Sequence, residues 1–181
     1  MIFSYQKPLN GKRVGVVFGS FAPLHQGHLD LIYRAKKEND GGAIVIVCGF
    51  DGDKGEPLMP HAKRYRYVRE FFADDDLVAV YAINDTEIGA DNYPNGWETW
   101  LKEFNRIWDR ATKCLPGDTI DRVWYVGDHE YFLDLTERNE KAILVDRVAD
   151  NPICSCHKSY SFLWRNRPAL KWIILERWPE S

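Results

Sequence analysis

Two histidines, His25 and His28, stand three residues apart in the segment 19–28, which reads GSFAPLHQGH. The segment follows a short apolar run and enters an expected helix, whose first N–H groups and partial positive charge favour anions. Its glycines let the backbone approach a phosphate closely. Two imidazoles on one helical turn can donate to phosphate oxygens and stabilise the charge that develops during phosphoryl transfer. The candidate phosphate-binding residues are Gly19, Ser20, Phe21, His25, Gly27 and His28.

This segment differs from two common phosphate-binding loops. It lacks the Gly-Lys-Ser/Thr ending of a Walker A loop, and the dinucleotide fingerprint Gly-x-Gly-x-x-Gly does not occur in it. The competing interpretation is that two histidines stand near a helix start by chance. The whole string, placed directly after an expected strand, is more specific than either histidine alone, and it therefore favours a nucleotide site.

The elements that must position the histidines alternate between buried strands and amphipathic helices. Short apolar, β-branched runs predict strands at Val14–Phe18, Ala43–Gly49, Leu77–Ile83, Val123–Gly127 and Ala142–Asp146. The spacing and composition of the intervening segments predict helices at His28–Lys37, His61–Phe72, Gly96–Cys114 and His129–Glu140. This alternation predicts an α/β fold with a doubly wound, parallel five-stranded sheet and helices on both faces. Ligands of such sheets bind beyond the carboxyl ends of the strands.

The loops expected at that edge hold further candidates. Lys54, after the second strand, and Arg64, on the basic helix that follows, could hold a substrate phosphate. A solvated helix face is the alternative for Arg64. Gly127, after the fourth strand, would allow the backbone to approach a nucleotide closely. Asp128 could contact substrate hydroxyls or cap the next helix.

The segment 19–28 closely resembles the G-x-F-x-P-x-H-x-G-H signature of the HxGH nucleotidyltransferase superfamily, whose members share a Rossmann-like sheet. The resemblance implies that His25 and His28 contact the triphosphate of ATP while a substrate phosphate attacks the α-phosphorus directly. It also implies that pyrophosphate leaves and that Mg²⁺ assists. Catalysis would then rest on positioning and charge stabilisation, without a covalent enzyme intermediate.

A second segment, 93–97, reads YPNGW and is similar to the substrate loop of the nicotinamide mononucleotide adenylyltransferase domain of NadR-type proteins. The similarity implies that Trp97 contacts the nicotinamide ring, with Asn95 and Gly96 shaping the loop. Tryptophan is the best aromatic partner for a flat cationic ring such as nicotinamide. Packing in the core is the alternative for Trp97.

The C-terminal part, residues 153–181, departs from the pattern of that superfamily. Relatives carry a second phosphate-binding motif with Ser-x-Thr before an Arg, whereas this chain has Cys154, Ser155 and Cys156 and, further on, Arg165. Ser155 and Arg165 are therefore the ATP-binding candidates of this part. Because a thiol is a poorer hydrogen-bond donor than a hydroxyl, this segment supports a competing hypothesis, a non-catalytic sensor of NAD or nucleotides.

Composition narrows the functional class. The 181 residues carry a formal net charge of −3, so no electrostatic footprint for nucleic acid is expected, and no apolar run of membrane-spanning length occurs. Residues 1–12 are interpreted as an extension ahead of one domain over 13–181, and their lack of an apolar signal region favours the cytosol. The four cysteines are expected to be free thiols there, without a metal site.

Together these observations predict a nicotinamide mononucleotide adenylyltransferase that uses ATP and Mg²⁺ and releases NAD and pyrophosphate. The nearest alternative keeps this chemistry and changes the phosphate acceptor, and the other alternative is the non-catalytic sensor. No NadR-type kinase segment with a Walker A loop is expected in this chain. A homo-oligomer is left open, as is the choice between the amidated and the deamidated mononucleotide.

Overall fold

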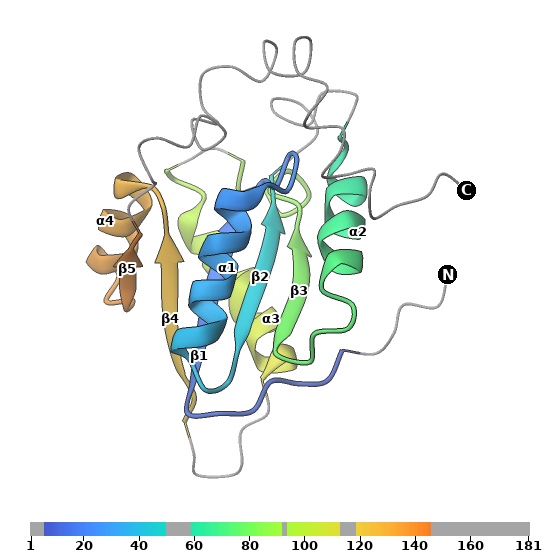
Figure 1. Ribbon diagram of the computed structural model, residues 1–181. Helices are drawn as coiled ribbons and strands as arrows, with labels where there is room; N and C mark the ends of the chain where they lie inside the picture. Colours follow the sequence, from blue (N-terminus) through green and yellow to red (C-terminus); the bar gives the residue numbers. More distant parts are fainter. Residues whose placement is uncertain (1–5, 50–58, 92–93, 113–118, 146–181) are drawn as a thin grey trace. The chain divides into compact units, whose positions relative to one another are not determined.

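The computed structural model describes residues 6–49, 59–91, 94–112 and 119–145, all of them in one unit, Met1–Asp146. Strands and helices alternate along these residues (Figure 1). The strands are β1 (Arg13–Gly19), β2 (Ala43–Cys48), β3 (Val78–Ile83), β4 (Asp121–Val126) and β5 (Ala142–Leu144). The helices are α1 (Gln26–Glu38), α2 (His61–Phe71), α3 (Trp97–Ala111) and α4 (His129–Glu137).

The strands form one five-stranded sheet in the order β3-β2-β1-β4-β5, and all neighbouring pairs are parallel. The central strand β1 places Val17 opposite Val45 of β2 and Val16 opposite Trp124 of β4. Chain order reverses between β1 and β4, and the crevice beyond the carboxyl ends at such a point is where ligands bind in these sheets. The predicted doubly wound parallel sheet is confirmed, and the histidine segment leaves β1 at this point.

Alternate residues of the strands contribute side chains to two apolar cores, one on each face of the sheet. On one face, Val17 and Val45 pack with Ile32 of α1 and Val68 of α2. On the other face, Trp124 packs with apolar side chains of α3 and α4. Figure 1 shows α1 and α2 in front of the sheet and α3 behind it. Full burial of each such aliphatic side chain contributes roughly 1.5–3 kcal/mol, so both helical layers are held to the strands.

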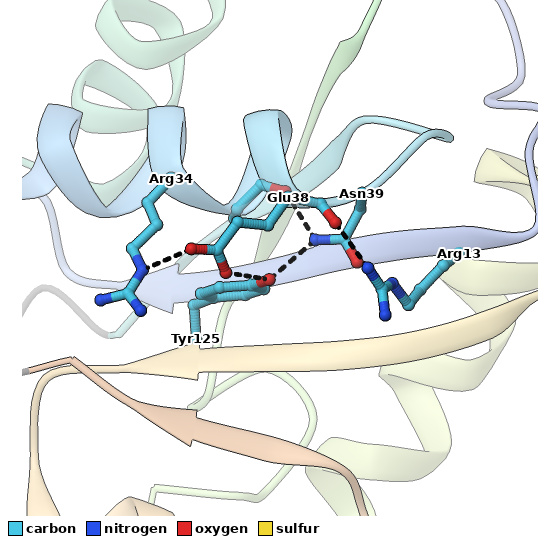
Figure 2. A network of polar contacts seen from close by, with 6 residues as sticks. Arg13, Arg34, Glu38, Asn39 and Tyr125 are labelled. Carbon is cyan, nitrogen blue, oxygen red and sulfur yellow. Dashed lines mark hydrogen bonds and ion pairs between the residues drawn. The ribbon is translucent and has the colours of Figure 1, made fainter.

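A polar network fixes the C-terminal end of α1 against the sheet (Figure 2). The side-chain amide of Asn39 donates to the Tyr125 hydroxyl at 3.0 Å, and that hydroxyl donates to the Glu38 carboxylate at 2.9 Å. Arg34 donates to the other Glu38 carboxylate oxygen at 2.8 Å, and Arg13 donates to the Glu38 carbonyl at 2.7 Å. These bonds join the last turn of the helix to β1 and β4, and they supply partners for polar groups at a helix end.

Glycine at position 15 allows α1 to cross β1 closely. A β-carbon on Gly15 would lie 2.9 Å from the Ala35 carbonyl oxygen and 2.9 Å from the amide nitrogen of Asn39. Both distances are below ordinary van der Waals contact, so the backbone of β1 approaches the helix only because this residue has no side chain.

Element boundaries differ slightly from the predicted ones. Helix α1 begins at Gln26 rather than at His28, because His25 already has the extended backbone of a cap residue. Helix α4 ends at Glu137 rather than at Glu140. Over the ranges that the structure describes, no helix is long and apolar enough to cross a membrane.

Candidate functional site

The N-terminal end of α1 is the first feature of the site, and it follows the carboxyl end of β1. His25 is the N-cap residue, and its carbonyl accepts the N–H groups of His28 at 2.9 Å and Leu29 at 3.1 Å. The side chain of His25 makes no capping hydrogen bond. An N-terminus that is not capped by its own side chain, together with the helix dipole, attracts anions.

The imidazole rings of His25 and His28 are stacked, with ring centres 3.7 Å apart and planes inclined by 24°. His25 is buried and His28 is half-buried. The Phe21 side chain, which is 1% exposed, meets the His28 ring edge-on with ring centres 4.8 Å apart. One helical turn therefore presents two imidazoles beside the helix N-terminus, and imidazole N–H groups can donate to phosphate oxygens.

The loop between β1 and α1 takes an unusual backbone path. The Ala22–Pro23 peptide bond is cis. Phe21 has a φ of 48°, in the left-handed region that bulky side chains rarely adopt. A residue with such a φ persists only where its surroundings hold it, and these residues cluster at functional sites. The half-buried Gly19 and Ser20 complete the loop, and the structure thus brings the predicted segment 19–28 together at one sheet edge.

Asp85 is a candidate residue that the sequence analysis missed. It follows β3 at the same edge of the sheet, and the Gly49 N–H and the Trp100 indole lie near enough to its carboxylate to lower its pKa. Burial raises the pKa of Asp85 above its ordinary value, although the nearby charges of His61 and Arg64 oppose that rise. Its place just after a strand of a parallel sheet is the signal that could have identified it.

Tyr131 of α4 is a second candidate that the sequence analysis missed. Burial raises the pKa of Tyr131 to about 12, and the neighbouring Cys48, Asp128 and Asp85 add to that rise. Its ring packs against Phe18 with ring centres 5.3 Å apart. A tyrosine with this pKa keeps its proton at neutral pH, so its hydroxyl can donate a hydrogen bond but does not serve as a base.

Trp97, predicted to contact the nicotinamide ring, begins α3 and packs in the core. It is 6% exposed, and its ring centre lies 5.9 Å from that of Phe18 and 5.7 Å from that of Trp100. Its indole N–H donates to Asp134 at 3.0 Å, and the Arg138 guanidinium lies 5.8 Å from its ring centre. These contacts show that Trp97 packs in the core, which was the alternative to contact with the nicotinamide ring. Contact with a substrate ring remains a prediction.

The residues before Trp97 form the start of α3. Gly96 is the N-cap residue, and its carbonyl accepts the Trp100 N–H at 2.9 Å. A β-carbon on Gly96 would lie 2.3 Å from the Ala90 carbonyl oxygen, so a larger residue would force the backbone apart. Asn95 is exposed. Contact of Asn95 or Gly96 with substrate remains a prediction.

Arg64, predicted to hold a substrate phosphate, is buried at the same sheet edge. Its guanidinium donates to the backbone carbonyls of Ser20 at 2.6 Å, Cys48 at 3.0 Å and Met59 at 3.0 Å. Its side chain therefore does not belong to a solvated helix face, which was the alternative. Phosphate binding by Arg64 remains a prediction.

Asp128 is the N-cap residue of α4, and its carboxylate accepts the Glu130 N–H at 3.0 Å. Of the two roles considered for Asp128, capping is the one that its contacts display. Gly127 precedes it, half-buried, just after β4. The remaining candidates lie outside the described residues: Lys54, Ser155 and Arg165, together with Cys154 and Cys156.

Comparison with known proteins identifies the family of the chain. A family model described as cytidylyltransferase-like matches residues 16–158. The chain is 34% identical over 122 residues to the trifunctional NAD biosynthesis/regulator protein NadR of Escherichia coli (strain K12), covering 62% of this chain and 28% of that protein. It is 33% identical over 95 residues to a probable nicotinate-nucleotide adenylyltransferase of Clostridium botulinum (strain Eklund 17B / Type B), covering 51% of this chain and 46% of that protein. The chain thus spans less than half the length of either relative.

The fold is similar to solved structures of NadR. The crystal structure of NadR protein in complex with NR gives a TM-score of 0.72 at 30% identity, covering 92% of this chain and 44% of that chain. The crystal structure of NadR protein in complex with NAD and AMP-PNP gives a TM-score of 0.65 at 30% identity, covering 83% of this chain and 41% of that chain. The family match over residues 16–158 confirms the resemblance that segment 19–28 carries. The chain therefore belongs to the cytidylyltransferase-like family of nucleotidyltransferases.

Proposed function

We propose that the chain joins nicotinamide mononucleotide and ATP into NAD and pyrophosphate. A phosphate oxygen of the mononucleotide attacks the α-phosphorus of ATP and forms a new P–O bond. The bond between the α-phosphorus and the oxygen that bridges to the β-phosphorus breaks, and its electron pair leaves with pyrophosphate. No atom of the protein becomes covalently attached.

The observation that carries this proposal is the stacked pair of His25 and His28 at the N-terminal end of α1. The triphosphate, and the additional charge on the leaving pyrophosphate, would lie where helix N–H groups and imidazole donors converge. Loss of one preorganised donor of this kind typically lowers a rate by roughly 10²–10³-fold. Phosphoryl transfer depends mainly on positioning and electrostatic stabilisation. The helix N–H groups and the two imidazoles would supply both.

The relatives support the choice of acceptor. Solved NadR structures are described as complexes with NR and with NAD and AMP-PNP. In this chain the aromatic cluster around Trp97 packs on Phe18, near the carboxyl end of β1, and aromatic faces are complementary to a cationic nicotinamide ring. Because the chain covers less than half of those NadR chains, we propose for it no activity of their remaining parts.

Mg²⁺ would enter together with ATP. Within the described ranges, no group of three His, Cys, Asp or Glu side chains could hold a metal ion, and Mg²⁺ with a nucleotide is commonly bound through one or two carboxylates together with substrate phosphates and water. The ion would neutralise charge on the phosphate oxygens. The helix N-terminus, with His25 and His28, would bind the phosphate oxygens that the ion leaves uncovered.

The test is turnover by the purified chain with nicotinamide mononucleotide, ATP and Mg²⁺, reading NAD through alcohol dehydrogenase. We expect NAD formation, and a rate lower by roughly 10²–10³-fold in His28→Ala. Nicotinate mononucleotide and phosphopantetheine are compared as acceptors through pyrophosphate release. Turnover with one of these and none with nicotinamide mononucleotide would replace the proposed acceptor. Binding of NAD by calorimetry with no turnover on any acceptor would leave the non-catalytic sensor.

A further inference from the structure

Arg64 is a buried cation that joins three separate backbone segments. Its Nη1 donates to the Ser20 carbonyl at 2.6 Å, in the loop after β1, and to the Cys48 carbonyl at 3.0 Å, at the end of β2. Its Nε donates to the Met59 carbonyl at 3.0 Å, just before α2. The side chain is 1% exposed. Two of its three nitrogens, Nε and Nη1, are therefore committed to carbonyls that arrive from different directions.

A guanidinium is stable away from water only where hydrogen bonds and opposite charge compensate its lost hydration. The carbonyls supply the hydrogen bonds, and the Asp85 carboxylate is near enough to interact electrostatically with Arg64. Gly49 borders the group, since a β-carbon there would lie 3.5 Å from Nη1 of Arg64 and 3.7 Å from the Ser20 hydroxyl. The guanidinium thus fills the space between the loop after β1 and the residue after β2.

The bond to Ser20 has a direct consequence for the histidines. The Ser20 carbonyl belongs to the peptide that joins Ser20 to Phe21, and Phe21 has the strained φ of 48°. Such a conformation persists only where neighbouring contacts hold it. The Phe21 ring then packs edge-on against His28 at 4.8 Å, and His28 stacks on His25 at 3.7 Å. A continuous path of contacts therefore leads from Arg64 to both imidazoles.

We propose that Arg64 is a positioning residue: by holding the Ser20 carbonyl it fixes Phe21 and, through it, the stacked pair of His25 and His28. It acts on the reaction without touching the phosphate, which distinguishes it from a direct ligand. The role rests on the adenylyl transfer proposed above. Lysine is a poor substitute, because one ammonium group cannot reproduce a planar fork that reaches several carbonyls.

Arg64→Lys keeps the charge and removes the fork, so it separates positioning from phosphate binding. We expect kcat to fall by about 10²-fold for a displacement on the order of 1 Å, while the KM values for ATP and mononucleotide stay nearly unchanged. The matched control is Arg66→Lys on the same helix, where the exposed Arg66 pairs with Glu70 at 3.7 Å, and its kinetics should equal those of the wild type. A raised KM with unchanged kcat in Arg64→Lys would identify a direct ligand and overturn the positioning role.

A measurement without turnover distinguishes failure of this role from failure of the proposed function. In the stacked arrangement the rings of His25, His28 and Phe21 shield one another, so the NMR shifts of the histidine ring protons report that arrangement. We expect these shifts to differ from those of the wild type in Arg64→Lys and to equal them in Arg66→Lys, whether or not the wild type makes NAD. Unchanged histidine shifts in folded Arg64→Lys would overturn the role. If that variant does not fold, Arg64→Gln is measured in the same way and interpreted by the same criterion.

Discussion

The two ends of α1 lie against the same sheet and are held in different ways. At the C-terminal end, the side chains of Glu38 and Asn39 are hydrogen-bonded to the Tyr125 hydroxyl, so the polar groups of this end have partners within the protein (Figure 2). At the N-terminal end, His25 caps the helix with its backbone carbonyl, and its ring stacks on His28 beside the positive end of the helix dipole. The first end holds the helix in place, and the second end is where we propose that the triphosphate binds. Substitutions at the two ends should therefore separate stability from catalysis.

The largest effect is expected at the N-terminal end, on catalysis. His25→Ala should lower kcat by about 10²–10³-fold. The double variant His25→Ala/His28→Ala should be little slower than either single variant, because residues that act as one unit have strongly non-additive effects. Steady-state kinetics on all three variants checks this. Multiplied losses in the double variant would mean that the two histidines act independently.

The next largest effect is expected where α1 crosses β1, on stability. Gly15→Ala places a methyl group 2.9 Å from the Ala35 carbonyl oxygen, and such overpacking typically costs about 1–3 kcal/mol. The free energy of unfolding in urea should fall by that amount, while kcat of the folded fraction stays at the wild-type value. A variant as stable as the wild type would contradict the close approach.

A smaller loss is expected from the polar network. Tyr125→Phe removes the hydroxyl that accepts from Asn39 and donates to Glu38, and an unmade buried hydrogen bond costs about 1–2 kcal/mol. The unfolding free energy should fall by that amount with unchanged kcat. Tyr33→Phe, at an exposed tyrosine, is the control and should change neither quantity. An equal loss of unfolding free energy in both variants would show that the hydrogen bonds of Tyr125 do not stabilise the fold.

The smallest effect is expected in the pH dependence of stability. Hydrogen bonds from Arg34 and Tyr125 hold the pKa of Glu38 below its ordinary value of 4.5. A carboxyl with a lowered folded-state pKa adds stability above its unfolded pKa, and this contribution is lost as pH falls through the folded pKa. Since the Glu38 side chain is 40% exposed, screening keeps the contribution below about 1 kcal/mol.

Glu38→Gln should therefore make the unfolding free energy less steep on the acid side, below the ordinary Glu pKa, and leave kcat at neutral pH unchanged. Urea unfolding of both proteins across acidic pH measures the slope. An identical slope in the variant and the wild type would show that Glu38 has the same pKa in the folded and unfolded states.

The sequence predicted what depends on local pattern. The apolar runs at Val14–Phe18 and Ala43–Gly49 identified buried strands, because a sheet covered on both faces needs continuous hydrophobic residues. His25 and His28 were predicted to bind phosphate because the segment 19–28 that carries them is continuous in the sequence, and their contact with phosphate stays a prediction. Asp85 was missed because burial and the groups that shift its pKa, among them Gly49 and Trp100, come from other segments, and the sheet register that aligns them is not visible in the sequence.

Arg64 and Trp97 illustrate the same limit for large side chains. A basic residue on a helix is compatible with phosphate binding, with solvent exposure or with a buried bond to backbone carbonyls, and only the neighbouring loops decide. The three carbonyls around Arg64 belong to residues up to 44 positions away. Likewise, the sequence of a helix start does not show whether an aromatic residue contacts substrate or packs in the core. In the structure the buried Trp97 ring packs against Phe18 and Trp100.

The central claim is a single direct transfer at the N-terminal end of α1, and the stereochemistry at the α-phosphorus tests it most directly. ATP with one sulfur of defined configuration on the α-phosphorus is converted with nicotinamide mononucleotide, and phosphorus NMR gives the configuration in the NAD analogue. We predict inversion, because one in-line displacement inverts the phosphorus. Retention would mean two displacements, with the adenylyl group held on a protein atom such as an imidazole nitrogen of His25 or His28, and it would contradict direct transfer.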